Sequence, residues 1–365
     1  MTAPTGERLA RGSVAGVSPY TSDVFDGAVD LSDNTNLWGP PPAAVRALQD
    51  APETALSRYP TLYSESLRAS LLEYVSLDAD ATIDVVTGCG SDDVIDTTMR
   101  AFGEPGDRVA FSTPTFSMIP LFARLNGLSP TAVPLTPTYD VDADRLVECR
   151  AKITYLCAPN NPTATAVSRA AVEYVVENAA GIVLLDEAYA EFAPESFCGL
   201  VSRSDRLVVA RTFSKAFGLA GIRVGYGIGA RTLTSLIARA RGPYKVSSLA
   251  ERAAVAALSP VVGGLPWVRQ HALLAITLRQ RLVTSLQELG LTVLPSEANF
   301  VMVPMRRSDT IARSLKERGV LVRAFRELPT ELPEFAASGG QALRISVGPW
   351  EMMQILLDHL ASVLS

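Results

Sequence analysis

The chain has 365 residues, of which 48% are hydrophobic and 19% charged, and its formal net charge is −5. This composition suits a filled globular core and excludes a disordered chain. The negative charge provides no basic field for nucleic acid, and no run approaches the roughly 18 apolar residues needed to cross a bilayer.

The first part of the chain alternates between helical and strand patterns. Residues 1–36 form an irregular arm in which Gly, Ser, Pro and Asp are scattered. From about residue 43, amphipathic stretches such as AAVRALQDA and SESLRASLLEYV predict helices, and SDDVIDTTMRAF predicts another, with Ser91 or Asp92 as N-cap. Apolar runs predict strands at 84–88, 107–114, 152–159, 181–189, 206–213 and 224–229. Strands separated by helices predict an α/β fold with a mostly parallel sheet covered on both faces.

A different pattern begins near residue 247. A long helical stretch runs to about residue 289, interrupted at 259–266, and further strands and helices follow, with a looser loop at 327–341. This pattern predicts a smaller α+β domain. We therefore expect an N-terminal arm that packs with the small domain and the active site, a large domain and a small C-terminal domain, over residues 1–36, 37–255 and 256–365.

Polar residues gather where the predicted strands end. In parallel α/β sheets, ligands bind beyond the carboxyl ends of the strands. Five strands place polar groups there: residues 88–92, Asn160 with Asn161, Asp186 with Tyr189, residues 212–215, and Arg223. This convergence predicts one functional site at that edge.

Lys215 is the candidate nucleophile of this site. A lone lysine after a strand is usually a solvated surface charge. Here the neighbours are apolar, and desolvation would lower the pKa of the amine and favour its neutral form, which attacks carbonyls. The neighbours in question are Phe213, Ala216, Phe217 and Leu219.

Asp186 ends an apolar strand, where an unpaired carboxylate is costly. It is either a helix N-cap or the partner of a protonated ring nitrogen, as in pyridoxal-phosphate enzymes. Gly90 and Ser91 open a helix whose free N–H groups suit a phosphate. Thr212, Ser214 and Arg223 would complete a phosphate cradle.

A nicotinamide-dependent enzyme is the competing interpretation. The Gly88–Gly90 stretch lacks the third glycine of the dinucleotide fingerprint. The Gly225–Gly229 stretch lacks the following helix and the later acidic residue. Both are poor matches to that fingerprint.

Several motifs resemble those of a known family. Over nearly its whole length the chain resembles the fold-type I pyridoxal-phosphate aminotransferases of class I/II, and most closely the histidinol-phosphate aminotransferases. The motifs are RYPTLYSESLR (58–68), TGCGSDD (87–93), PTFSM (114–118), APNNPT (158–163), LLDEAYAEF (184–192), RTFSKAFGLAGIRVGY (211–226), PYKV (243–246), PSEANFVMV (295–303), GVLVRAF (319–325) and LRISVG (343–348). The resemblance implies a large domain with a mixed, mostly parallel sheet and a smaller α+β domain.

The resemblance also implies roles for the candidate residues. Lys215 would hold pyridoxal 5′-phosphate as a Schiff base and act as general base, and Asp186 would keep the pyridine nitrogen protonated. Asn161 and Tyr189 would hydrogen-bond the phenolic oxygen of the ring, with Tyr189 counted among the catalytic residues. Phe116 would stack on the ring. The phosphate would contact Gly90, Ser91, Asp92, Thr212, Ser214, Arg223 and, from the neighbouring subunit of a homodimer with a shared active site, Tyr59.

The implied reaction is a transamination of the class EC 2.6.1. An L-amino acid or an amino-alcohol phosphate of the histidinol-phosphate kind would give its amino group to a 2-keto acid such as 2-oxoglutarate, in ping-pong order. Arg344 would grip the substrate α-carboxylate. The other residues expected at the substrate are Tyr20, Asn36, Asn161 and Arg323.

Two departures from the family leave the substrate open. Ala164 stands where the family's Asn-Pro-Thr-Gly motif has Gly, and Gly permits backbone angles that Ala resists. Thr35 stands where the family's Asn-Glu-Asn motif has Glu. A lyase or decarboxylase on the same scaffold is therefore an alternative. A non-catalytic pyridoxal-phosphate sensor fused to a DNA-binding module is disfavoured, because no basic helix-turn-helix extension precedes residue 40.

Cysteine and histidine content bears on the compartment and on metal binding. The four cysteines form no Cys-x-x-Cys pair and the N-terminus lacks the apolar stretch of a signal peptide. We therefore expect reduced thiols and a cytoplasmic location, with no membrane or nucleic-acid partner. His271 and His359 each lack a second His or Cys nearby, so we expect no metal site.

Overall fold

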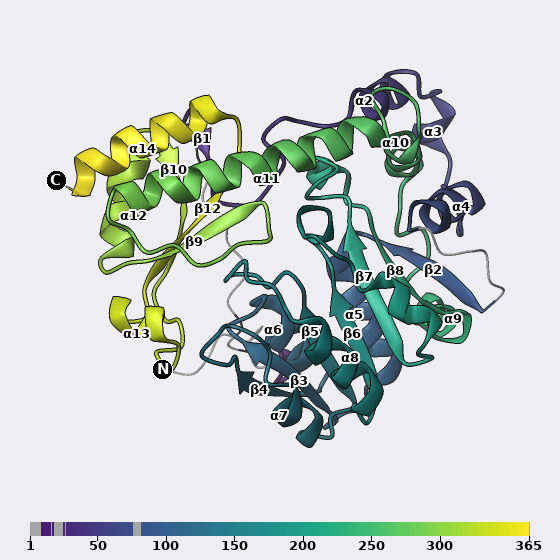
Figure 1. Cartoon of the computed structure of the whole chain (residues 1–365). Coiled ribbons are helices and arrows are strands. Elements are labelled where there is room, and N and C mark those ends of the chain that lie inside the picture. The colour runs from purple at the N-terminus through teal and green to yellow at the C-terminus, as the bar shows by residue number, and fades with distance from the viewer. Residues whose placement is uncertain (1–8, 16, 18–24, 26, 76–81, 365) are drawn as a thin grey trace.

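The computed structural model describes residues 9–15, 17, 25, 27–75 and 82–364, and Figure 1 shows the arrangement of the chain. A seven-stranded sheet with the order β2-β8-β7-β6-β5-β3-β4 forms its larger part. β8 runs antiparallel to both of its neighbours and the other pairings are parallel, as predicted. The strands are β2 (Ile83–Gly88), β3 (Arg108–Thr113), β4 (Ser129–Pro134), β5 (Ile153–Cys157), β6 (Ile182–Asp186), β7 (Leu207–Thr212) and β8 (Gly225–Ala230).

Helices cover both faces of this sheet, because its central strands are apolar on both sides. On one face, α5 (Ser91–Phe102), α6 (Met118–Leu125) and α9 (Arg231–Ala240) enclose one core. The opposite face carries a second and larger core. The helices that contribute buried residues to it include α2 (Pro42–Gln49), α4 (Glu65–Tyr74), α7 (Ala143–Glu148), α8 (Arg169–Asn178) and α10 (Ser248–Leu258).

Side chains alternate between the two cores along each central strand. In β6, Ile182 and Leu184 join the α5 side, whereas Val183 and Leu185 join the α8 side. The same alternation holds in β5 and β7, as expected for a period of two residues. Neighbouring residues at a strand end therefore point to opposite faces of the sheet.

A smaller part of the molecule is built around a third core. It contains a three-stranded antiparallel sheet of β9 (Phe300–Pro304), β11 (Arg323–Phe325) and β12 (Ala342–Ser346), and a parallel pair of β1 (Val29–Asp30) and β10 (Val320–Leu321). Its helices are α12 (Ser308–Glu317) and α14 (Trp350–Leu364). The long helix α11 (Leu265–Glu288) runs between this part and the larger one, as Figure 1 shows.

The structure corrects three expectations from the sequence. The predicted arm contributes β1 to the third core, and the predicted loop at 327–341 contains α13 (Pro333–Ser338). Neither Ser91 nor Asp92 caps α5: the N-cap is Gly90, and Ser91 is the first helical residue. The boundary predicted at 255/256 stays a prediction, because α11 places Val268 in the α8-side core and Leu282 in the third core.

The remaining short elements lie in connections. They are α3 (Thr54–Ser57), η1 (Ala190–Phe192), η2 (Cys198–Ser202) and η3 (Ala220–Ile222). In the described part of the chain, no helix is both long and apolar enough to span a membrane.

Candidate active site

A cavity of about 600 Å³ lies at the carboxyl ends of β5, β6 and β7. The smaller part of the molecule lines its other side with residues from 30–35, from β11 and from β12. Of the residues predicted from the sequence, twelve line this cavity: Ser91, Asp92, Phe116, Asn161, Asp186, Tyr189, Thr212, Ser214, Lys215, Arg223, Arg323 and Arg344. The tertiary structure thus brings together groups that are spread over more than 250 positions of the sequence.

Lys215 projects into this cavity from the turn after β7. Its Nζ donates a hydrogen bond to the carbonyl oxygen of Asp33 at 2.9 Å and lies 5.8 Å from the centre of the Tyr189 ring. Burial and, next, the positive charge of Arg344 lower the pKa of the amine from 10.5 to about 8. A substantial fraction of the amine is therefore neutral near physiological pH, as nucleophilic and basic lysines require.

Asp186 is buried at the end of β6 with its carboxylate held by two donors. Oδ2 accepts from the Tyr155 hydroxyl at 2.8 Å and Oδ1 from the Ala188 N–H at 3.0 Å. Burial raises the pKa of Asp186 to about 6, against the opposing effect of the Tyr155 hydrogen bond. Within the described ranges, no lysine, arginine or histidine forms an ion pair with it. The carboxylate is thus oriented but lacks a counter-charge from the protein.

Tyr155 was not predicted from the sequence. It lies in β5 beside β6, and Cys157 of that strand pairs in register with Asp186. Its side chain is completely buried, and its hydroxyl donates to Asp186. The signal available in the sequence was its odd-numbered position in β5, which places it on the α5 side of the sheet, the side on which Asp186 also lies.

Asn34, which precedes Thr35, was not predicted as a site residue. It is buried with φ 60°, and its Nδ2 donates to the Tyr189 hydroxyl at 3.1 Å. Its backbone is held by Ser346 and Asn299 at 2.9 and 3.0 Å. The segment before Thr35 therefore fixes the position of the Tyr189 hydroxyl.

The N-terminus of α5 and Arg223 lie together at the wall of the cavity, in an arrangement that suits an anion. Arg223 lies 3.6 Å from Asp92 Oδ2 and donates to the Ser214 hydroxyl at 3.3 Å. Gly90 has φ +81°, and a Cβ there would meet the Arg223 guanidinium at 2.7 Å. The glycine thus lets a cation approach a helix N-terminus, where free N–H groups and the helix dipole favour an anion. The Thr212 hydroxyl extends this arrangement through Ser214, at 3.0 Å.

Two arginines on neighbouring strands line the cavity. Arg323 of β11 and Arg344 of β12 are direct partners in the antiparallel register, and both line the cavity. Arg344 donates to Asn161 Oδ1 at 2.8 Å and to the Ser32 carbonyl at 2.7 Å. Like charges directly opposite each other on paired strands repel. An anionic group between these guanidiniums would relieve the repulsion.

The other predicted site residues lie elsewhere. Asn36 is not among the residues lining the cavity, and its amide is used within the fold, by the Ala216 carbonyl at 2.9 Å and the Trp38 N–H at 3.0 Å. Tyr59 is 82% exposed and stacks on Tyr244 with ring centres 4.7 Å apart. Tyr20 lies outside the described residues. Their predicted roles remain predictions.

Ala164, the departure in the Asn-Pro-Thr-Gly motif, adopts the backbone conformation that glycine favours. Its φ is 65° and its side chain is completely buried. Its N–H donates to the Asn160 carbonyl at 2.8 Å. The turn that carries Asn161 is therefore formed with an alanine in the left-handed region, at some cost in strain.

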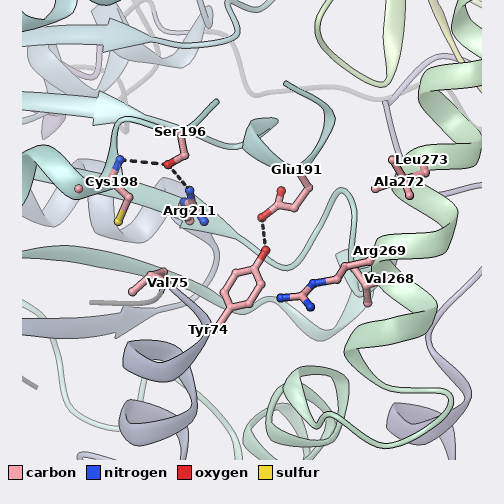
Figure 2. Close-up of a pocket in the computed structure, with 11 residues that line it drawn as sticks. Tyr74, Val75, Glu191, Ser196, Cys198, Arg211, Val268, Arg269, Ala272 and Leu273 are labelled. Carbon is pink, nitrogen blue, oxygen red and sulfur yellow. Dashed lines mark hydrogen bonds between the residues drawn. The ribbon is translucent and has the colours of Figure 1, made fainter. Parts of the chain in front are cut away.

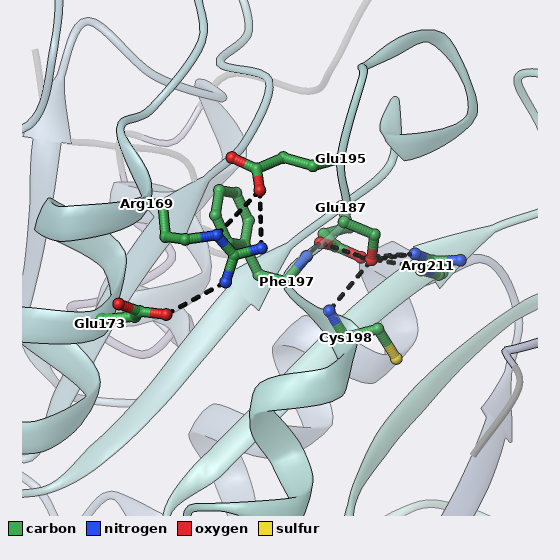
Figure 3. A network of polar contacts seen from close by, with 8 residues as sticks. Arg169, Glu173, Glu187, Glu195, Phe197, Cys198 and Arg211 are labelled. Carbon is green, nitrogen blue, oxygen red and sulfur yellow. Dashed lines mark hydrogen bonds and ion pairs between the residues drawn. The ribbon is translucent and has the colours of Figure 1, made fainter.

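On the other face of the sheet, Glu187 forms a separate polar network, shown in Figure 3. Arg211 of β7 donates to Glu187 Oε2 through Nε at 2.9 Å and through a terminal nitrogen at 2.7 Å. The carboxylate also accepts from Ser196 and from the Phe197 N–H. Both members of the pair are buried, and the charge of Glu187 is balanced within the fold.

Comparison of the sequence with known proteins identifies the family to which the chain belongs. Residues 26–360 match the family described as aminotransferase class I and II. The chain is 36% identical to the histidinol-phosphate aminotransferase of Roseiflexus castenholzii, over 97% of this chain and 98% of that protein. It is 35% identical to that of Methanosarcina barkeri, over 88% of this chain and 85% of that protein.

Solved structures share the fold. The histidinol-phosphate aminotransferase of Sinorhizobium meliloti in complex with pyridoxal-5′-phosphate is similar with a TM-score of 0.80 at 24% identity, over 93% of this chain and 92% of that one. Thermus thermophilus aspartate aminotransferase with maleate gives 0.76 at 20% identity, over 92% of each chain. The fold is thus that of the fold-type I aminotransferases, with the mixed, mostly parallel sheet predicted from the sequence.

Proposed function

The chain belongs to the class I and II aminotransferase family and is a pyridoxal-phosphate-dependent aminotransferase, and we propose that its amino donor carries an anionic group in addition to the amine. An amino-alcohol phosphate of the histidinol-phosphate kind, or an L-amino acid, fits this description. A 2-keto acid such as 2-oxoglutarate would be the acceptor. The observation that carries the proposal is the direct pairing of Arg323 with Arg344 in the cavity that holds Lys215.

The cavity offers the groups that pyridoxal phosphate needs. The α5 N-terminus and Arg223 suit its phosphate, and Asp186, buried without a counter-charge among the described side chains, suits its protonated ring nitrogen. Asn161 and Tyr189 would meet its phenolic oxygen, and Phe116 its ring face. When bound, the cofactor supplies an electron sink for negative charge at the substrate α-carbon.

The protein's own groups would then bind the substrate and move its proton. Lys215, with a pKa of about 8, would accept the substrate α-proton on Nζ. It would then return this proton to the cofactor carbon that is bonded to the transferred nitrogen. Arg344 and Arg323 bind the anionic groups of donor and acceptor in turn, and Asn161 holds the Arg344 guanidinium through its Oδ1. Asn34 keeps the Tyr189 hydroxyl in place during both half-reactions.

We also propose a homodimer that shares its active sites. The exposed, stacked pair of Tyr59 and Tyr244 is a large aromatic surface on a single chain, and such aromatics are typical of interfaces. Tyr59 would reach the cofactor phosphate of the neighbouring subunit. A cytoplasmic location is proposed with it, supported by the four free thiols.

Steady-state kinetics with a matched set of donors test the proposed substrate class. Histidinol phosphate, histidinol and L-histidine are offered with 2-oxoglutarate, and glutamate formation is measured. We expect kcat/KM to be higher for histidinol phosphate, which carries an anionic group, than for histidinol, which carries none. Arg323→Gln should reduce kcat/KM for histidinol phosphate by roughly tenfold to a hundredfold, and for histidinol by less than threefold.

Two outcomes would contradict the proposal. An Arg323→Gln enzyme that loses activity equally on histidinol and histidinol phosphate would remove the role of Arg323 in recognising the anion. Release of carbon dioxide or ammonia without glutamate formation would indicate the lyase or decarboxylase chemistry considered from the sequence.

A further inference from the structure

A second cavity of about 560 Å³ is lined by Tyr74, Glu191 and Arg211, among other residues (Figure 2). It is walled by the end of α4, by the region of η1 and η2, and by the first half of α11. The residues that line it and those that line the catalytic cavity do not overlap. Its size is ordinary for a small-molecule site.

Glu191 presents a carboxylate to this cavity. One oxygen accepts from the Tyr74 hydroxyl at 3.0 Å, as Figure 2 shows. In the described part of the chain the carboxylate forms no ion pair. Arg211, which also lines the cavity, is engaged by Glu187. Burial raises the pKa of Glu191, so a cation at this position would be stabilised together with the ionised carboxylate.

Arg269 supplies the opposite charge at the rim. Figure 2 shows its guanidinium extending from α11 toward Tyr74. The side chain is exposed, and over residues 27–75 and 82–364 it has no acidic partner. The cavity thus offers one anionic and one cationic group that the fold leaves available.

Much of the remaining lining is apolar. Val268, Ala272 and Leu273 form one wall from α11, and Val75 lies at the end of α4. Leu273 is 64% exposed, although a leucine gains free energy when it is covered. A matching ligand carries an ammonium, a carboxylate and a short aliphatic group.

We propose that this second cavity binds a free α-amino acid with an aliphatic side chain, its ammonium group at Glu191 and its carboxylate at Arg269. The site is distinct from the one that holds the reacting donor. Glu191 follows Tyr189 by two residues in the chain, and α11 continues into the third core, where Leu282 and Leu286 are buried. An occupant therefore contacts the residues that follow the catalytic Asp186–Tyr189 segment and a helix that reaches the third core, which gives it a route to influence turnover.

Calorimetry with L-leucine and two analogues tests the proposal. 3-Methylbutylamine lacks the carboxylate of leucine, and 4-methylpentanoate lacks its amine. The protein is the holoenzyme reduced with borohydride, in which the cofactor is fixed to Lys215 and cannot exchange with an added amine. We expect leucine to bind once per chain and each analogue to bind roughly tenfold to a hundredfold more weakly, because each loses one charged hydrogen-bonded contact.

Variants assign the binding to this cavity. Glu191→Gln and Arg269→Gln should each weaken leucine binding about tenfold or more. Arg323→Gln, in the catalytic cavity, is the matched control and should leave leucine binding unchanged. Because Arg269 is exposed, its replacement does not disturb the core, and the test does not depend on the stability of the Glu191 variant.

The opposite results would overturn the proposal. Leucine that fails to bind the reduced holoenzyme at millimolar concentration would exclude the site. Binding that is lost in Arg323→Gln but retained in Arg269→Gln would assign the amino acid to the catalytic cavity. An amine that binds as tightly as leucine would exclude recognition of the carboxylate.

Discussion

Asp186 and Glu187 are adjacent in the chain and both are buried, yet their surroundings differ completely. Glu187 is balanced by Arg211 and by hydrogen bonds from Ser196 and Phe197. Asp186 receives only neutral donors, from Tyr155 and the Ala188 N–H, among the described contacts. Buried charge without a counter-charge is costly. The charge of Glu187 is thus balanced by the protein itself, whereas the carboxylate of Asp186 is available to a cationic group of a ligand.

Replacement of Lys215, which lines the same cavity as Asp186, should have the largest effect on kcat. Lys215→Ala should lower kcat by at least about a thousandfold, because the general base and the attachment point for the cofactor are lost together. Glutamate formation in steady state measures this effect. Lys152→Ala, at an exposed position before β5, is the control and should keep the wild-type rate. Turnover at the normal rate in Lys215→Ala would contradict the assignment.

Neutralising each of the two carboxylates in turn should separate catalysis from stability. Glu187→Gln should lower the free energy of unfolding by about 3–5 kcal/mol, because the buried Arg211 charge loses its partner. Asp186→Asn should instead lower kcat by at least about a hundredfold without lowering the stability of the cofactor-free protein. Urea unfolding and kinetics on the same two variants measure both effects. If the two variants lost stability equally, the distinction between the carboxylates would fail.

The pH dependence of stability sharpens the same contrast. The pKa of Asp186 is raised from 3.8 to about 6, so the folded cofactor-free protein binds more protons than the unfolded chain in that window. Its free energy of unfolding therefore falls as pH rises through the window, by about 3 kcal/mol in all from this group. Relative to wild type, cofactor-free Asp186→Asn should gain stability between pH 4 and pH 7. An identical difference at both pH values, measured by urea unfolding, would contradict the raised pKa.

The smallest effect is expected from the hydroxyl that orients Asp186. Tyr155→Phe removes a donor to the ionised carboxylate, so the pKa of Asp186 should rise above about 6. One hydrogen bond of this kind corresponds to about 1 kcal/mol, or roughly five- to tenfold in rate or cofactor affinity. Infrared titration of the carboxyl band in the cofactor-free protein reads the pKa directly.

Tyr226→Phe is the matched control for that experiment. Tyr226 is also completely buried, and its hydroxyl lies near Arg211, on the opposite face of the sheet from Asp186. Its replacement should leave the carboxyl titration of Asp186 where it was. Equal shifts in both variants would indicate a general packing effect and not the Tyr155 contact.

Local sequence patterns were sufficient for much of the larger part of the molecule. The helix predicted at 91–102 is α5, and each of the six strands predicted there overlaps one of the observed strands. The strand β4 was missed, because SPTAVP combines two prolines with weak alternation. The first residue of a helix was also predicted wrongly where the N-cap is a glycine without a capping side chain, as Gly90 is for α5.

The sequence by itself determined the chemistry of the cofactor end. Apolar runs followed by short polar motifs fix which residues stand at the strand ends, because parallel strands all end at one edge. Lys215, Asp186, Arg223 and Ser91 were predicted in this way, and all four line the same cavity. The family relationship follows from the same motifs, with residues 26–360 matching as one unit.

Only the tertiary structure decided which side chains hold those groups in position and that Arg323 and Arg344 line the cavity as neighbours. The Tyr155 contact depends on the lateral pairing of β5 with β6, and the Asn34 contact on residues more than 150 positions away. The pairing of Arg323 with Arg344 depends on the register between β11 and β12. Such contacts arise from packing between distant segments, which no local period encodes. They also separate Asp186 from Glu187, since a single step along the chain turns one carboxylate toward the cavity and the other toward Arg211.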